Sequence, residues 1–120
     1  MSKRYSGVEK MLKKPLFDKH GYPAGETLKA IEKWPHEDGF VELMEFVGKA
    51  WNEDYGKVEK EEREGVMVYK FVTGGWSGNE SIIEDLERNF VFWSLCWLKS
   101  ERGGYYEFEV EKKSLMRKNP

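Results

Sequence analysis

The stretch 90–98 constrains the fold more than any other part of the chain. Seven of its nine residues are large and apolar, and only Ser94 and Cys96 are small. The preceding stretch 79–88 has an amphipathic pattern of helical period, so the whole of 79–98 is predicted as one long helix. A helix that is apolar on all sides has to be covered on all sides. The helix is therefore either the central element of the domain or one that completes its burial in an oligomer.

The composition is that of one globular domain. The chain has 120 residues, of which 35% are charged, yet 15% are aromatic, too many for a disordered chain. A single cysteine excludes an internal disulfide and favours a reducing compartment, so a cytoplasmic protein is expected. No apolar run is long enough to span a membrane, and we expect no membrane partner. The net charge of -2 makes no strong case for a nucleic-acid partner.

Charge is distributed unevenly along the chain. Residues 1–20 contain six Lys or Arg and two acids, whereas residues 37–65 contain ten acids and four bases. Such blocks are usually two solvated surfaces of opposite sign. Alternatively, the basic arm docks on a partner or on the acidic surface of a neighbouring subunit.

The remaining pattern predicts an α+β fold. A small sheet of about three strands is packed by the one long helix and by two or three short N-terminal helices. We expect a single domain, 1–120, with a basic arm and short helix at 1–20, a globular core at 22–111 and a frayed tail at 112–120. Helical spacing predicts helices at 8–16, 25–34 and 40–51, and β-branched or alternating residues predict strands at 57–62, 66–73 and 105–111.

The glycine-rich turn at 73–79 is the best candidate for a ligand site. It joins a predicted strand to a predicted helix, and a helix start offers free N–H groups and positive potential to an anion. Three glycines in five residues permit close approach of the backbone. The turn matches neither the Walker A motif nor the dinucleotide-binding motif. The predicted site residues here are Thr73, Gly74, Gly75, Trp76, Ser77, Gly78 and Asn79.

A structural role for the same turn is the competing interpretation. Ser77 and Glu80 have the spacing of a capping box, in which the carboxylate would occupy donors that an anion needs. Trp76 is the tryptophan that we would test for stacking on a base.

The loop 99–104 holds two further candidates, Arg102 and Gly103. The fork of Arg102 suits a phosphate or carboxylate, although a solvated arginine after a helix end is the common case. If one helix joins the two strands, this loop and the turn at 73–79 lie at opposite ends of that helix. They would then share a site only between subunits of an oligomer.

No catalytic or metal-binding arrangement stands out. His20 and His36 lie in predicted loops, and one cysteine with two distant histidines does not make a zinc site. Cys96 lies on a predicted buried helix face and is interpreted as an inert thiol. The sequence therefore predicts no enzyme activity, no metal and no cofactor.

The run Thr73-Gly-Gly-Trp-Ser-Gly-Asn-Glu, followed by Phe92-Trp93, Cys96-Trp97 and Arg102-Gly-Gly-Tyr-Tyr, resembles a family of small uncharacterised phage and prophage proteins. The resemblance covers about residues 22–110 and implies a phage accessory protein acting in the host cytoplasm. Such a context favours an anti-defence protein that sequesters a phosphate-bearing small molecule or nucleotide signal without catalysis. The alternative is a protein–protein inhibitor of a host defence or regulatory protein. A homo-oligomer is compatible with either.

Overall fold

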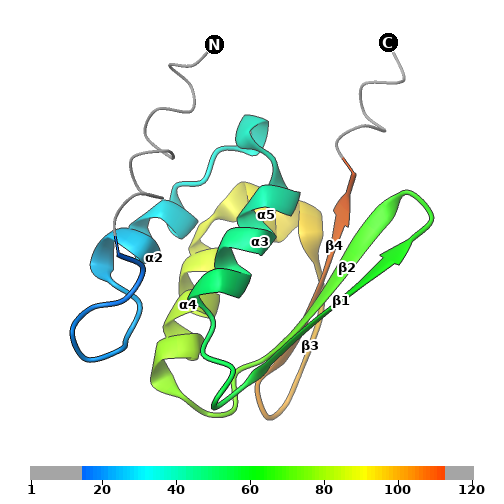
Figure 1. The fold of residues 1–120 in the computed structure, drawn as a ribbon. Helices are drawn as coiled ribbons and strands as arrows, with labels where there is room; N and C mark the ends of the chain where they lie inside the picture. Colours follow the sequence, from blue (N-terminus) through cyan, green and yellow to red (C-terminus); the bar gives the residue numbers. More distant parts are fainter. Residues whose placement is uncertain (1–14, 113–120) are drawn as a thin grey trace.

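The computed structural model describes residues 15–112, which form an α+β fold as predicted. Figure 1 shows the helices gathered on one face of a single sheet. The predicted helix at 8–16 lies almost wholly outside the described residues, as does the tail from residue 113. None of the described helices is long and apolar enough to cross a membrane. In chain order the elements are α2 (Gly25–Glu32), the short 3-10 helix η1 (His36–Asp38), α3 (Phe40–Ala50), β1 (Lys57–Arg63), β2 (Val66–Val72), α4 (Ser77–Arg88), α5 (Phe90–Cys96), β3 (Trp97–Glu101) and β4 (Tyr105–Glu111).

The sheet has four strands rather than the three expected, in the order β1-β2-β4-β3, and every neighbouring pair is antiparallel. The predicted hairpin of β1 and β2 is confirmed, with the charged strand β1 at the sheet edge, where charge opposes pairing with other chains. β4 lies beside β2, so that Val72 faces Tyr105 at one end and Val66 faces Glu111 at the other. Because β2 and β4 are antiparallel, the segment between them is not a crossover connection.

The prediction of one long helix over 79–98 is wrong. The helix ends at Arg88, α5 starts a new axis at Phe90, and the chain becomes strand β3 from Trp97. The physical cause is Asn89, which has φ -80° and ψ 85° and leaves the helical region. Apolar residues suit a buried helix and a strand equally, so the hydrophobic pattern alone did not reveal the change.

The side chain of Asn89 bonds to three residues and so joins the end of α2 to the start of α5. Its Nδ2 donates to the carbonyl oxygens of Ile31 and Trp34, at 3.0 and 3.1 Å, and so holds the end of α2. Its Oδ1 accepts from the backbone N–H of Phe92 at 3.2 Å and caps the start of α5. Asn89 is buried, so these bonds replace water that the site excludes.

The core lies between the sheet and the helices. Phe92 is fully buried and packs against Phe40 and Phe108, with ring centroids 5.3 and 5.2 Å away. Within α5 only Phe92 and Cys96 are buried. Of the two alternatives for the apolar stretch, full cover within the domain is therefore wrong, since Phe90 is 77% and Leu95 62% exposed.

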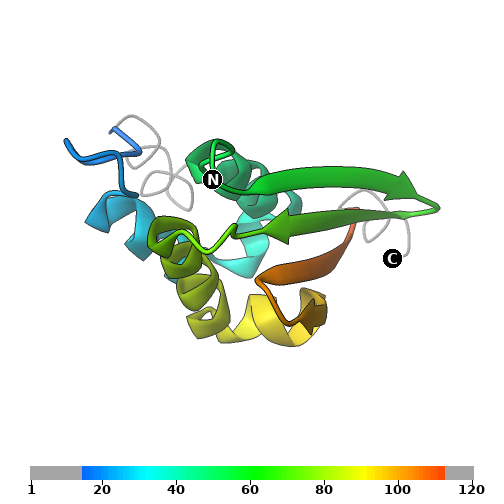
Figure 2. The same ribbon diagram turned by 90° about the horizontal axis from the view of Figure 1, so that it is seen from below.

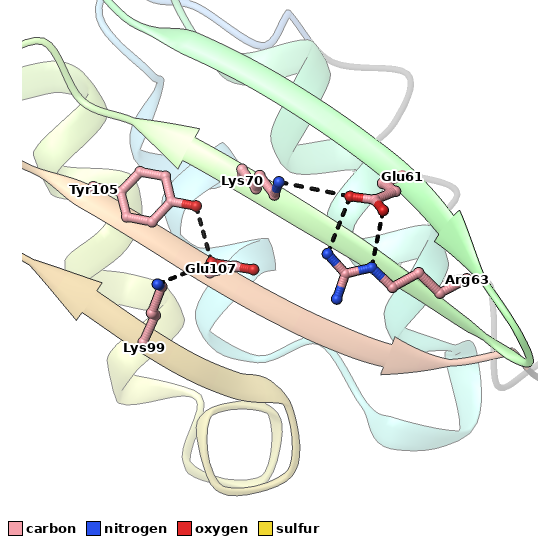
Figure 3. Close-up of polar contacts among 6 residues, drawn as sticks. All are labelled: Glu61, Arg63, Lys70, Lys99, Tyr105 and Glu107. Carbon is pink, nitrogen blue, oxygen red and sulfur yellow. Dashed lines mark hydrogen bonds and ion pairs between the residues drawn. The ribbon is translucent and has the colours of Figure 1, made fainter.

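The outer face of the sheet is polar and carries two clusters of paired side chains (Figure 3). Glu61 accepts two bonds from the Arg63 guanidinium, and its carboxylate lies 3.6 Å from the Lys70 ammonium. On the neighbouring strands, Glu107 accepts from the Tyr105 hydroxyl at 2.9 Å and lies 3.9 Å from Lys99. The sheet therefore presents one face to the core and carries these ion pairs on the other.

We predict that Asn89→Ala lowers the free energy of unfolding by about 2–4 kcal/mol. The change removes a helix cap and leaves buried carbonyl groups without their donor. Urea denaturation of the purified protein measures the effect.

Asn52→Ala is the matched control, because among the described residues the Asn52 side chain accepts a single, exposed bond, from the backbone N–H of Asp54. It should cost less than about 1 kcal/mol. Equal losses in the two variants would show that Asn89 does not organise the helices.

Candidate functional site

The predicted glycine turn is present between β2 and α4. Gly74 and Gly75 have φ of 68° and 76°, a conformation that glycine adopts at little cost. Trp76 occupies the N-cap position of α4 and gives it no side-chain hydrogen bond. The N–H groups of the first helical turn, from Ser77 to Asn79, therefore have no side-chain cap. Whether an anion binds them stays a prediction.

The glycines are also required by packing. A Cβ at Gly74 would overlap the carbonyl oxygen of Tyr55, and a Cβ at Gly78 would overlap the Trp76 ring. Gly75, in contrast, has open space around it. Two of the three glycines thus permit close contacts within the chain, which is the structural interpretation of the turn.

Asn79 is fully buried and braces the turn. Its Oδ1 accepts from the backbone N–H of Asn52 at 3.0 Å. Its Nδ2 donates to the carbonyl oxygens of Asn52 and Thr73, both at 3.2 Å. Both polar atoms of this side chain are therefore engaged in tying the turn to the loop before β1.

Trp76 is sandwiched between two tyrosines. The Tyr22 and Tyr55 rings stack on it, with centroids 4.9 and 5.3 Å away. Stacking of a base on Trp76 would require one tyrosine to move. The outer faces of Tyr22 and Tyr55, which are 41% and 58% exposed, are the accessible aromatic surfaces here.

The predicted capping box of Ser77 and Glu80 does not form, because the helix begins one residue earlier than the box requires. The Thr73 hydroxyl instead donates to the Glu80 carboxylate at 3.5 Å and accepts from the backbone N–H of Gly75 at 3.3 Å. Thr73 is buried, and its hydroxyl stabilises the turn through these two bonds.

Arg102 and Gly103 lie at the same end of the sheet as the glycine turn, and the expectation of opposite ends is wrong. The backbone N–H of Thr73 donates to the carbonyl oxygen of Gly104 at 3.0 Å. The cause is strand β3, which returns the chain along the sheet before β4 begins. Arg102 is exposed, and within residues 15–112 its guanidinium makes no ion pair. One chain therefore brings both predicted loops together without an oligomer.

A cleft that the sequence did not predict lies at the other end of the sheet. Its volume is about 680 Å³. Six residues of β2 separate it from the glycine turn, about 20 Å along the strand. No local motif signals it, because its walls come from four separate parts of the chain. It is lined by His36, Glu37, Gly39, Phe40, Val41, Glu42, Val66, Leu95, Cys96, Trp97, Leu98, Glu109, Val110 and Glu111.

One wall of this cleft continues into an exposed apolar surface, the α5–β3 surface. Figure 2 shows α5 at the outer margin of the molecule. Trp97 also stacks on Trp93, with centroids 6.0 Å apart. The sequence revealed the apolar density of this segment, but only the structure shows which members face outward. The α5–β3 surface consists of Phe90, Val91, Leu95, Trp97 and Leu98, all at least 42% exposed.

Cys96 lies behind this surface and is buried. Burial raises the pKa of its thiol from 9.0 to about 12, which keeps it in the unreactive protonated form. In the described part of the chain, no group of three or more His, Cys, Asp or Glu residues is arranged to hold a metal ion. The His36 ring lies against Phe40 at the mouth of the cleft, with centroids 5.2 Å apart.

Comparison with known proteins found no matching family model, no matching curated protein and no matching solved structure. The site therefore has to be interpreted from its own chemistry.

We predict that Gly74→Ala destabilises the protein far more than Gly75→Ala. Both substitutions place a side chain at positive φ, which costs about 1 kcal/mol. Only Gly74→Ala also forces Tyr55 away, and the total loss should reach about 3 kcal/mol or more. Urea denaturation of the two variants measures the difference, and equal losses would contradict the tight packing of the turn.

Proposed function

We propose that this protein is a non-catalytic binding protein that docks on another protein through the α5–β3 surface. The proposal rests on the exposure of five large apolar side chains within nine consecutive residues. Scattered exposed apolar residues are normal, but a continuous cluster marks an interaction surface.

Energetics support this assignment. Covering these five side chains would contribute on the order of 5 kcal/mol before the costs of association. Aromatic residues at the centre of an interface are typical of the side chains that dominate binding. Trp97 is held in place by its stack on Trp93 and by a 2.9 Å bond from its ring N–H to the Ser100 hydroxyl. It is therefore pre-organised for contact.

The resemblance to small phage proteins supplies a biological context for this proposal. In that context the partner is a host defence or regulatory protein in the host cytoplasm. Occupying its surface would inhibit it without chemistry, which agrees with the inhibitor interpretation of the sequence.

Phe90→Ser combined with Val91→Ser tests the proposal. Both residues are exposed and lie outside the cleft, so stability should change by no more than about 0.5 kcal/mol per site. Partner proteins captured from host lysate by the wild type should be lost from the double variant.

Lys57→Ser combined with Glu59→Ser in β1 is the control, because both residues are exposed and β1 forms the edge of the sheet opposite β3. This control should retain the captured partner. Equal capture by wild type and the Phe90/Val91 variant would overturn the proposal.

A second candidate function is binding of a phosphate-bearing small molecule at the glycine turn. It is favoured by the position of Arg102, whose loop adjoins Thr73 beside the uncapped start of α4. Gly75 and Gly103 are exposed in the same region and leave room for a ligand. Backbone N–H groups and one guanidinium together suit a phosphate.

Titration with cyclic and linear nucleotides, followed by thermal shift, tests this second candidate. Arg102→Ala should weaken nucleotide binding about tenfold, because one charge-assisted hydrogen bond is lost. The thermal shift at a given nucleotide concentration should fall accordingly. Arg88→Ala serves as the control, since that arginine pairs with Asp85 on the far end of α4. Absence of any shift, or an equal shift in both variants, would exclude the glycine turn as a phosphate site.

A further inference from the structure

Strand β4 runs past the beginning of strand β3. The first residue of β3, Trp97, is paired with Phe108, and the later residues of β3 pair with 105–107. The last three residues of β4, 109–111, are paired with β2 alone among the described strands. One side of β4 is therefore an open sheet edge at this point, and it lies in the wall of the cleft.

The direction of the backbone groups follows from two bonds at the ends of the sheet. Thr73 N–H donates to the Gly104 carbonyl, and Lys112 N–H donates to the Gly65 carbonyl at 3.1 Å. In an antiparallel pair, alternate residues turn their N–H and C=O groups to the same neighbour. Even-numbered residues of β4 therefore face β2, and Glu111 directs its backbone groups to the side where β3 has not yet begun. This strand end can accept a further strand.

The chemistry of the cleft selects what that strand contains. Phe40, Leu95 and Val110 provide apolar contact, while four carboxylates belong to the lining and no lysine or arginine does. Within residues 15–112, none of the four carboxylates takes part in an ion pair. Glu107, on the same face of β4 as Glu109, lies in contrast 3.9 Å from the Lys99 ammonium. The four are Glu37, Glu42, Glu109 and Glu111.

We propose that the cleft binds an extended segment of the partner that alternates apolar and basic residues and continues the sheet along β4. This inference rests on the proposed protein-binding function and names the chemistry of the bound segment. Successive side chains of a strand point to opposite faces of a sheet. Apolar residues of the added strand would lie on the face of Val110, and basic residues would lie beside Glu109 and Glu111.

A second copy of the chain fits the cleft less well. A symmetric dimer places the same patch against itself. The four unpaired carboxylates of each copy would then be brought together, and like charges oppose association. A basic segment removes this repulsion and is the occupant that charge complementarity favours.

The probe is an acetylated ten-residue peptide of alternating valine and lysine, titrated into the full chain by calorimetry. We expect one peptide per chain, with amide signals of residues 109–111 shifted in NMR spectra. Glu109→Gln combined with Glu111→Gln should weaken binding roughly tenfold, as two exposed ion pairs are lost. Glu53→Gln combined with Glu59→Gln removes the same charge away from the cleft and should bind as the wild type does.

Backbone chemistry separates strand addition from simple charge attraction. Methylation of alternate peptide nitrogens in the probe, on the edge that meets β4, should abolish binding, whereas methylation on the opposite edge should leave it unchanged. Equal binding of the two methylated peptides would overturn the inference, as would equal binding by the two pairs of glutamine variants.

Failure of this inference and failure of the proposed function give different results. If Phe90→Ser with Val91→Ser loses the host partner while the valine–lysine peptide fails to bind the wild type, the proposed function stands and this inference is wrong. A concentration-dependent dimer in light scattering that protects the amides of 109–111 would also overturn it, because a second copy would then occupy the cleft.

Discussion

The fold depends on the buried side chain of Asn89. Its amide holds the end of α2 through two carbonyl oxygens and caps the first turn of α5. A helix continued through this position would carry the apolar stretch straight on beyond α4. The cap instead starts a new axis, so that Phe92 enters the core and the chain is free to extend as β3 from Trp97. The hydrogen bonds of this buried amide are all made in one arrangement of the helices. Other arrangements are disfavoured because they would leave buried polar atoms unpaired.

The glycine turn shows how folding and binding compete for the same groups. Gly74, Gly78 and Asn79 are committed to contacts within the chain, and Trp76 is covered on both faces. The backbone N–H groups at the start of α4 receive no side-chain cap from Trp76, and the guanidinium of Arg102 is exposed nearby. The motif that looks most like a ligand site is thus largely a device that joins β2, α4 and the loop before β1.

The opposite end of the sheet differs in its electrostatics and in its surface. On the outer face, near the sheet edge, the Arg63 guanidinium lowers the pKa of the Glu61 carboxyl, and Glu61 in turn raises the pKa of Arg63. Carboxylates around the cleft form no ion pair among the described residues, and the neighbouring α5–β3 surface is apolar and exposed. Exposed carboxylates beside uncovered apolar side chains are the features on which the proposed binding function rests.

The sequence by itself determined the fold class, the helices α2 and α3, the β1–β2 hairpin and the last strand. Each follows from a local pattern: helical spacing in α3, β-branched residues in β2 and strict alternation in β4. The sequence also located the turn at 73–79, because glycine at positive φ is a local requirement. Only the tertiary structure decided that the apolar stretch breaks at Asn89, since the partners of that amide lie 55 and 58 residues away in the chain. The tertiary structure also decided that the loop of Arg102 adjoins Thr73 and that β4 extends past the start of β3 beside the cleft. Both depend on strand pairing and register, which join distant residues by hydrogen bonds that no local pattern specifies.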